Sequence, residues 1–249
     1  MSAGVGVITP AGDAPTIPSA VADPSRQSGS QPQPQPQPQL CGALLGARAH
    51  VCAFFRDTNE EDRALLPFIK AGLAAGEKIV HTIDPARRAN HMSRLAAAGI
   101  DFNAAHSHGQ FDLHDWTDTH LRDGRFDPDR TLALFSQIRL SAARQGYPLT
   151  RFITHMDWAL EDDAILIDLL VYEARANELR LGQPGPTHPV ICAYDLTRFS
   201  GEFIVDVMRT HPMTLIDGTV HENPYFVPPE EFIRELRNRR GSRVVGSRL

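Results

Sequence analysis

The side chains most able to do chemistry in this sequence lie within or directly after short apolar runs. His50 and Cys52 lie two residues apart in the run His50-Val-Cys-Ala-Phe-Phe55. Because side chains alternate along a strand, both would point to the same face. An imidazole and a thiolate can bind a soft metal together. On spacing alone, a packed cysteine beside a hydrogen-bonded histidine explains the pair better.

A second group of ionisable residues follows the apolar run that begins at Arg151. It reads His155-Met-Asp-Trp158. If the strand continues, His155 and Asp157 share a face, so that Asp157 orients the imidazole or each side chain meets a ligand. Trp158 would then form an apolar wall. A capped strand end above a core tryptophan fits the same pattern, and the residues do not decide between the two interpretations.

A third group lies on and after the apolar run that begins at Pro189. Cys192 and Tyr194 would share one strand face, and Asp195 would stand at the end of that strand. The alternative is a buried core thiol, which is the commoner role of an unpaired cysteine, with Asp195 opening the next helix.

Three further candidates lie inside a long amphipathic stretch. Glu173 and Asn177 are four residues apart and would share a helix face, beside Tyr172. If that face covers the sheet, these side chains can reach a bound ligand. If it does not, they form a solvated stripe with a half-buried tyrosine.

Several catalytic loops are missing from the sequence. It contains no Gly-x-x-x-x-Gly-Lys-Ser/Thr, no Gly-x-Gly-x-x-Gly and no Gly-x-Ser-x-Gly motif. The turn after the first apolar run reads Arg56-Asp-Thr-Asn59, whose side chains replace the bare backbone that cradles phosphates. We therefore expect neither P-loop nucleotide hydrolysis nor an α/β-hydrolase, and we predict that the protein is not an enzyme.

Strands and helices alternate along the part of the chain that carries these groups. The expected strands cover residues 50–55, 78–83, 111–116, 151–155 and 189–194, followed by a pair at 213–216 and 219–221. Amphipathic stretches separate them, with Thr58 expected to cap the first helix. This order predicts an α/β fold of three layers, with a mostly parallel sheet covered by helices on both faces. Ligands of such sheets bind at the carboxyl ends of the strands.

Composition divides the chain into three parts. Residues 1–46 end in a Gln-Pro repeat and are expected to form a disordered arm, because they cannot bury enough apolar surface to order themselves. Residues 47–236 form the expected domain. Residues 237–249 are expected to be a basic, flexible tail.

Charge and cysteine content restrict the compartment and the partners. The 249 residues have a formal net charge of -5 and only 3 cysteines. These values argue against direct binding to nucleic acid or to an anionic membrane, and against a disulfide framework. The sequence shows no apolar run long enough to span a membrane and no secretory signal, so we expect a cytoplasmic protein.

The order of the motifs resembles the MEDS domain, the sensory domain of methanogen and methylotroph regulators. The likeness covers residues 47 to about 235. The matching motifs are His50-x-Cys52, Pro67-Phe-x-x-x-Gly-Leu-x-x-Gly-Glu77, Gly124-Arg-Phe-Asp-Pro128, Met156-x-Trp158-Ala159, Tyr172-Glu173-Ala174 with Asn177, Cys192-x-Tyr194-Asp195 with Phe199, Arg209-Thr-His-Pro212 and Glu222-Asn-Pro-Tyr225.

The resemblance implies a RecA-like or KaiC-like fold without a phosphate loop, and a role in sensing small hydrocarbon derivatives in prokaryotic signalling or transcriptional regulation. The stand-alone form is expected to act through a separate protein: a kinase, an anti-sigma-type partner or a transcription factor. A homodimer and a pure protein-interaction module are alternatives. No cofactor and no metal are expected.

One departure from the family pattern concerns the proposed site. His155 stands where the pattern has Glu, and Asp157 stands where it has Ser or Thr. The change introduces a side chain that titrates near neutral pH. The expected ligand-binding residues are His50, Cys52, His155, Asp157, Trp158, Tyr172, Glu173, Asn177, Cys192, Tyr194 and Asp195. A metal sensor or enzyme using His50, Cys52, His155, Asp157 and Cys192 is the alternative.

Overall fold

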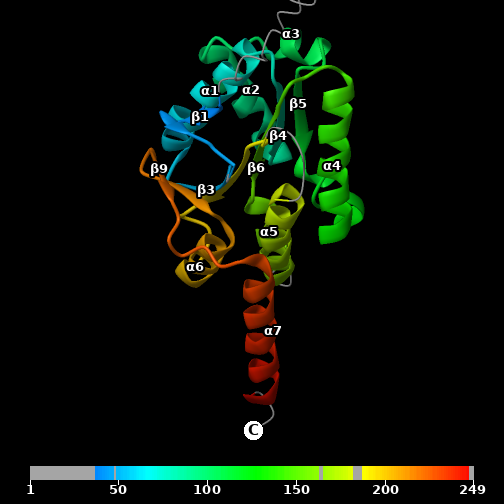
Figure 1. Ribbon diagram of the computed structural model, residues 1–249. Helices are drawn as coiled ribbons and strands as arrows, with labels where there is room; N and C mark the ends of the chain where they lie inside the picture. The colour runs from blue at the N-terminus through cyan, green and yellow to red at the C-terminus, as the bar shows by residue number, and fades with distance from the viewer. Residues whose placement is uncertain (1–36, 48, 163–164, 182–186, 247–249) are drawn as a thin grey trace, which may run out of the picture. The chain divides into compact units, whose positions relative to one another are not determined.

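A seven-stranded sheet forms the centre of the computed structural model, which describes residues 37–47, 49–162, 165–181 and 187–246. Its strand order is β5-β4-β6-β7-β3-β8-β9. All neighbouring strands are parallel except the last pair, β8 and β9, which is antiparallel. This confirms the predicted α/β fold with a mostly parallel sheet (Figure 1).

The strands and helices follow one another in the expected alternation. The strands of the sheet are β3 (His50–Phe55), β4 (Lys78–Ile83), β5 (Phe111–Asp115), β6 (Thr150–His155), β7 (Val190–Asp195), β8 (Met213–Ile216) and β9 (Thr219–Glu222). The α-helices are α1 (Thr58–Ala74), α2 (Arg88–Ala97), α3 (Phe102–Ser107), α4 (Pro128–Arg144), α5 (Ile165–Leu181), α6 (Gly201–Thr210) and α7 (Pro229–Gly246). Short 3₁₀ helices include η1 (Pro85–Arg87) and η4 (Asp157–Glu161).

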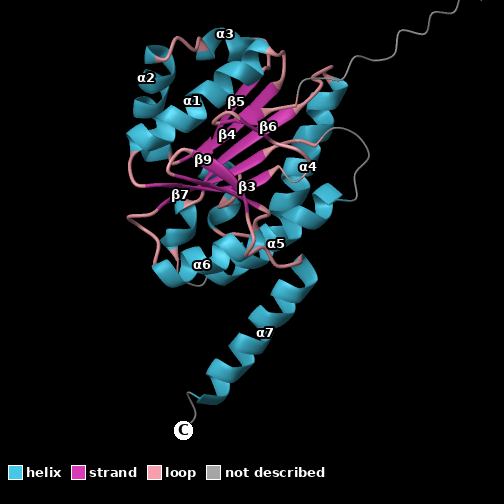
Figure 2. Ribbon diagram, turned by 60° about the vertical axis from the view of Figure 1, so that its left-hand side comes forward, coloured by secondary structure: helices cyan, strands magenta, loops and turns pink. Residues whose placement is uncertain are grey.

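The two faces of the sheet bury separate apolar cores. Helices α1, α2 and α3 cover one face, where Val51 and Ala53 of β3 pack. Helices α4, α5, α6 and the first half of α7 cover the other, where Cys52 and Phe54 of the same strand pack. Figure 2 shows the sheet between these two layers. We call the two sides the α1 face and the α5 face.

The helices begin and end close to the capping, glycine and proline residues of the sequence, but the predicted cap of α1 is wrong. The cap of α1 is Asp57, whose carboxylate accepts a hydrogen bond from the backbone N–H of Glu60 at 2.8 Å, and not Thr58 as predicted. Gly76, with φ +70°, ends the turn after α1, where a side chain would be strained. Pro128 occupies the first turn of α4, where its missing N–H has no partner to lose.

One part of the family pattern has a packing role. A Cβ on Gly72 would lie 2.7 Å from the Cδ1 of Ile79 and 2.8 Å from the Cδ of Arg151, so a larger residue would force these buried side chains to move. Arg151 is buried, donates to the carbonyl of Phe68 at 2.7 Å and forms an ion pair with Glu77. Gly72 therefore leaves room for the Arg151 side chain, which binds α1 through the carbonyl of Phe68 and is itself paired with Glu77.

Both predicted domain boundaries need correction. Residues 39–44 form a hairpin of β1 (Gln39–Leu40) and β2 (Ala43–Leu44), and Leu40 and Leu45 are buried in the core of the α1 face. The packed region therefore begins before residue 47, because these leucines supply apolar surface. The rest of the predicted arm, residues 1–36, lies outside the described residues. At the other end, α7 continues through residue 246, into the segment expected to be a flexible tail.

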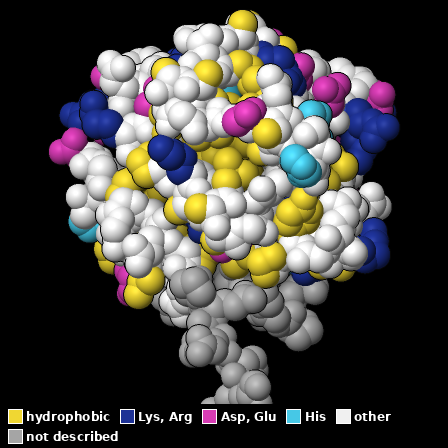
Figure 3. All heavy atoms as spheres, turned by 90° about the horizontal axis from the view of Figure 1, so that it is seen from above, with side chains coloured by type: hydrophobic (Ala, Val, Ile, Leu, Met, Phe, Trp, Pro, Cys, Tyr) yellow, Lys and Arg dark blue, Asp and Glu magenta, His cyan; other side chains and the backbone are white. Residues whose placement is uncertain are grey.

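The surface seen from above carries charged side chains of both signs around a central area where hydrophobic side chains reach the surface (Figure 3). Among the described residues, no helix combines the length and the apolar character that a membrane span requires.

Candidate functional site

Four buried side chains converge on the α5 face of the sheet. They are His50, Glu173, Cys192 and His211, and we call them the buried donor cluster. One nitrogen, sulfur or carboxylate oxygen from each lies within 4.8 Å of those of all the others. The Oε2 of Glu173 is the centre, 3.2 Å from the Nε2 of His50 and 3.4 Å from the Nε2 of His211.

Four elements place these side chains. Cys192 of β7 lies beside Cys52 of β3 in the register, and His50 lies two residues before Cys52, on the same face. His211 ends α6 just before β8, the neighbour of β3 on its other side. Glu173 comes from the middle of α5, which lies across these strands. The sulfur of Cys192 is 3.5 Å from the Nε2 of His50.

Outer contacts hold both imidazoles by their second nitrogen. The Nδ1 of His50 lies 3.0 Å from the Oδ1 of Asn177. The amide nitrogen of Asn177 donates to the carbonyl of Thr210 at 2.7 Å, which fixes the orientation of that side chain. The Nδ1 of His211 lies 2.9 Å from the carbonyl of Val207 and 2.9 Å from the Oγ1 of Thr210. Carbonyl and amide oxygens accept hydrogen bonds, so Nδ1 carries the proton and Nε2 faces the cluster.

The carboxylate of Glu173 is strongly held as the anion. Burial would raise its pKa, but His211 and His50 outweigh burial and lower the pKa well below its ordinary value. Tyr194 donates to the Oε1 of Glu173 at 2.7 Å. Burial, followed by Glu173, raises the pKa of the Tyr194 hydroxyl well above its usual range, which keeps it a donor. The neighbouring Cys52 lies outside the cluster, and its thiol donates to the carbonyl of Met213 at 3.6 Å.

A pocket lies at the carboxyl ends of β3, β6 and β7, where the sequence placed the ligand. It encloses about 310 Å³ of empty space, part of which is open to solvent. We call it the carboxyl-end pocket. Its lining residues are Phe55, Asp57, Thr58, Glu61, Arg87, His155, Asp157, Ala193, Tyr194 and Asp195.

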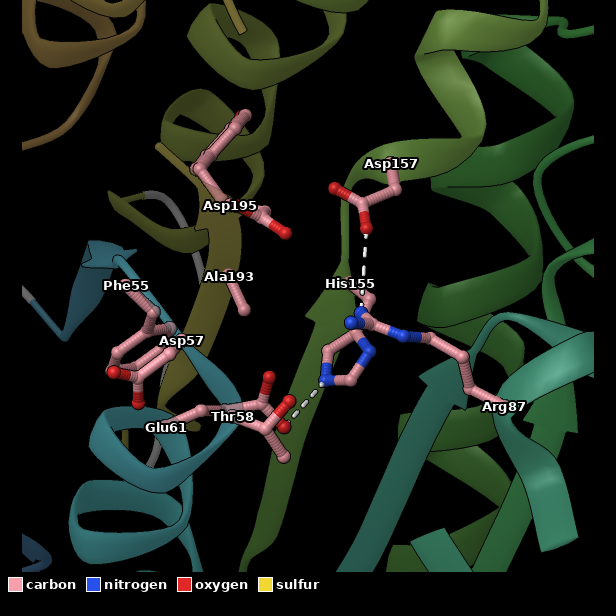
Figure 4. A pocket seen from close by; sticks show the side chains of 10 residues that line it. Phe55, Asp57, Thr58, Glu61, Arg87, His155, Asp157, Ala193 and Asp195 are labelled. Carbon is pink, nitrogen blue, oxygen red and sulfur yellow. Dashed lines mark ion pairs between the residues drawn. The ribbon is translucent and has the colours of Figure 1, made fainter. Parts of the chain in front are cut away.

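Charged pairs from different elements meet in this pocket. The Oδ2 of Asp157 lies 3.6 Å from Arg87, and the Nε2 of His155 lies 3.3 Å from the Oε1 of Glu61 (Figure 4). The same Oδ2 of Asp157 lies 2.9 Å from Arg198. Burial would raise the pKa of Glu61, but His155 and then Arg94 lower it to about 2. Burial would lower the pKa of His155, but Glu61 outweighs burial and raises it.

Two more histidines stand behind His155 on the α1 face. The ring of His81 lies 5.1 Å from that of His155 and 4.6 Å from that of His91. Neither nitrogen of His81 has a hydrogen-bond partner among the described residues. Burial, followed by His91 and His155, lowers the pKa of His81 far below its ordinary value. Burial, followed by His155 and Arg94, lowers the pKa of His91 to about 3.

The structure separates residues that the sequence expected together. His155 lies level with Ala193 of β7, on the α1 face, whereas Cys192 and His50 point to the α5 face. One site using both His50 and His155 is therefore wrong, and so is the metal set that joined His155 and Asp157 to His50. The sheet lies between the two groups.

Trp158 and Tyr172 lie in neither site but in the apolar core of the α5 face. Trp158 is completely buried, and its ring lies 4.7 Å from that of His120 and 4.5 Å from that of Phe126. Tyr172 packs edge-on to Phe126 at 5.6 Å. Neither residue lines the carboxyl-end pocket, so Trp158 is not the expected wall of that pocket.

Reasoning from the sequence missed several residues of both sites. His211 is not among the ligand-binding residues predicted from the sequence, although its motif, Arg209-Thr-His-Pro212, directly precedes a strand that pairs with β3. The pocket residues Glu61 and Arg87 belong to the first turn of α1 and to η1. The sequence could have indicated these two residues only by their position, because each follows the end of a parallel strand, where ligands bind.

Comparison with known proteins identifies the family of this chain. The family model described as the methanogen/methylotroph, DcmR sensory domain matches residues 49–212. The chain belongs to the MEDS family. Both His50 and His211 lie within the match, and so do all residues that line the carboxyl-end pocket.

Individual relatives of this MEDS protein are distant. The transcriptional repressor DcmR of Methylorubrum extorquens is 24% identical over 178 residues, which are 71% of this chain and 63% of the repressor. A KaiC-like protein of the archaeon Pyrococcus horikoshii is 15% identical in sequence and matches with a TM-score of 0.48, covering 72% of this chain and 77% of that protein. The alignment thus leaves more than a third of the repressor unmatched.

Proposed function

We propose that this MEDS protein is a non-catalytic sensor that binds a small polar hydrocarbon derivative in the carboxyl-end pocket and reports its presence to a separate output protein. Membership of a sensory family supports the role. The feature that carries the choice of site is a set of buried polar groups at the strand ends whose hydrogen-bonding capacity is incompletely used.

Two atoms in the pocket favour a polar ligand, because the Asp157 carboxylate accepts a hydrogen bond and the Nδ1 of His155 donates one when the imidazole is protonated. The Oδ1 of Asp157 and the Nδ1 of His155 are buried and have no hydrogen-bond partner among the described residues. Leaving such groups unsatisfied costs about 1–3 kcal/mol each, so a ligand that pairs with them gains affinity. An alcohol or an amine can donate to Asp157, whereas a plain hydrocarbon cannot. The pocket lies at the small end of the range of ligand sites, which favours a small ligand.

The same residues offer a way to transmit binding. Asp157 holds Arg198, which follows β7, and Arg87, which belongs to η1, while His155 holds Glu61 of α1. A ligand that takes over a bond of Asp157 or His155 changes the balance among these pairs. The first turn of α1 and the loop after β7 could then have one arrangement in the free protein and another in the bound protein. Binding changes the populations of these two arrangements only if the ligand has different affinities for them.

The output of this signal is also part of the proposal. DcmR is described as a transcriptional repressor, which suggests transcriptional regulation as the readout. The partner is a kinase, an anti-sigma-type protein or a transcription factor, or else a second copy of this chain.

A thermal-shift screen tests the proposal. Small alcohols, alkylamines, halocarbons, organic acids and nucleotides are added one class at a time to the purified full chain, because only a ligand of the native state raises the Tm. We expect a rise with alcohols or amines and none with halocarbons.

Variants locate the response. Asp157→Asn and His155→Gln should remove the rise, while Asp112→Asn, which breaks an ion pair with Lys78 outside the pocket, should retain it. A chain that responds to no class would favour the alternative of a protein-interaction module. A response that survives both pocket substitutions would place the ligand elsewhere.

A further inference from the structure

We infer that the buried donor cluster binds a divalent metal ion of the zinc class, held by two imidazoles, one thiolate and one carboxylate. This site is distinct from the carboxyl-end pocket and does not depend on the function proposed for it. Zinc is bound in proteins by this choice of donors, and four protein ligands are the usual number when its role is structural.

The distances between donor atoms suit a tetrahedral ion. With Zn–N of about 2.0–2.1 Å and Zn–S of about 2.3 Å, the edges of the tetrahedron are roughly 3.3–3.6 Å. The Oε2 of Glu173 lies 3.2 Å from His50, 3.4 Å from His211 and 3.6 Å from the sulfur of Cys192. The sulfur lies 3.5 Å from His50. Four of the six separations are therefore already close to those that a metal at the centre would impose, and the other two, from His211 to His50 and to Cys192, are within 4.8 Å.

The outer contacts match those of metal-binding histidines. A histidine that binds a metal through one nitrogen usually donates its other N–H to a carbonyl or carboxylate, which fixes the tautomer. The Oδ1 of Asn177 accepts this hydrogen bond from the Nδ1 of His50, and the carbonyl of Val207 accepts it from the Nδ1 of His211. Each imidazole then directs Nε2 toward the carboxylate. Without a cation, that arrangement needs a proton on Nε2, since a nitrogen lone pair facing a carboxylate is repulsive.

Charge balance also favours a divalent ion. Glu173 and His211 are completely buried, and His50 and Cys192 are 1% and 3% exposed. One thiolate and one carboxylate cancel the two charges of the ion, so the occupied cluster is neutral with both imidazoles uncharged. Neutrality is important here because an unbalanced charge in such a core is costly.

The same geometry indicates the kind of metal site. The cluster offers four ligands and is surrounded by protein, which leaves no position for a substrate. A closed site of this type stabilises the fold or reports metal occupancy. It ties α5 and the end of α6 to β3 and β7.

Metal analysis and cobalt spectroscopy of the full chain test this inference. Protein from zinc-supplemented cells, purified without chelators and under reducing conditions, should contain one zinc per chain. After removal of the zinc, titration with cobalt(II) should give the intense visible bands of a tetrahedral site and a thiolate-to-cobalt charge-transfer band.

Two cysteine variants provide the matched comparison. Cys192 and Cys52 are register partners on neighbouring strands, and both are buried. Cys192→Ser should abolish the charge-transfer band and weaken zinc binding by at least about 100-fold, whereas Cys52→Ser should keep both. Asn177→Ala should weaken zinc binding by about 10–100-fold while the band persists.

The readouts separate metal loss from misfolding. Circular dichroism of each variant checks the fold, and His50→Gln provides a second ligand variant should Cys192→Ser fail to fold. Substoichiometric zinc with no tetrahedral cobalt spectrum in folded wild-type protein would overturn the inference, as would a charge-transfer band that disappears in Cys52→Ser and remains in Cys192→Ser.

Discussion

The buried donor cluster and the carboxyl-end pocket use the same residue types on opposite faces of one sheet. The cluster joins two histidines, and the pocket joins one, to a glutamate from a covering helix. In the cluster, the Nδ1 atoms of His50 and His211 meet oxygen atoms that fix their tautomers. In the pocket and the histidine group behind it, His81 and the Nδ1 of His155 have no such partner among the described residues.

This difference separates a rigid arrangement from an adaptable one. Imidazoles whose outer nitrogens are anchored can change neither tautomer nor direction without breaking a buried hydrogen bond. Imidazoles without such anchors can change protonation or partner when something enters the pocket, as expected of a sensor. The following predictions test this contrast, from the largest expected effect to the smallest.

Removing the central charge of each region should have unequal effects. In metal-free protein, Glu173→Gln should lower the free energy of unfolding by about 3–5 kcal/mol, because two buried imidazoles and the Tyr194 hydroxyl lose the carboxylate that they face. Glu61→Gln should cost less, about 1–3 kcal/mol, because the buried carboxylate pairs with His155 but borders the pocket, where water can reach the group left unpaired. Urea denaturation measures both. Equal losses would contradict the contrast.

The outer anchor of the cluster should also contribute to stability. Asn177→Ala leaves the Nδ1 of His50 and the carbonyl of Thr210 without their partner, which should cost about 2 kcal/mol. The control is Asn103→Ala, an exposed change on α3 that should leave the unfolding midpoint nearly unchanged. A similar midpoint for the two variants would show that the anchor contributes little.

The histidine group should make stability depend on pH. His91 has a pKa of about 3 in the folded protein and about 6.5 when unfolded, so the unfolded chain binds more protons between these values. Its contribution is present above about pH 6.5 and is lost as the pH falls toward 3. The free energy of unfolding should therefore fall with acid, and His91→Gln should reduce that fall by about 1–2 kcal/mol at about pH 5.

His155 should change the free energy of unfolding with pH in the opposite direction to His91. Its pKa is raised, so its contribution is present below the unfolded value of about 6.5 and is lost as the pH rises through the folded value. Guanidinium denaturation at several pH values, with His155→Gln beside His91→Gln, separates the two. An unchanged pH profile in His91→Gln would contradict the assignment.

The arginine pairs of the pocket should affect stability least. The Arg198 side chain is 40% exposed, so Arg198→Ala should change the free energy of unfolding by less than about 1 kcal/mol. It should nevertheless alter the response to any ligand found in the screen, because Arg198 holds Asp157 in place. A variant with unchanged ligand affinity would remove Arg198 from the pocket's function.

The sequence predicted the fold well and the sites in part. Alternating apolar runs revealed the strands because a buried parallel sheet needs continuous apolar segments. Glu173 and Asn177 were predicted on one helix face, and α5 does direct both toward β3 and β7. The separation of His50 from His155 could not be predicted, because it depends on the register of β6 against β7. His211 was missed because its neighbours are 38 and 161 residues away in sequence, at Glu173 and His50.

Tyr194 belongs to both regions. It lines the carboxyl-end pocket, and its hydroxyl donates to Glu173 at the centre of the buried donor cluster. If an ion on one side of the sheet alters how firmly Tyr194 is held, it alters the free energy of admitting a molecule on the other. Thermodynamic reciprocity then requires that the molecule change the affinity for the ion by the same factor. One hydroxyl would thereby make the protein a coincidence detector, with each occupant setting the threshold for the other.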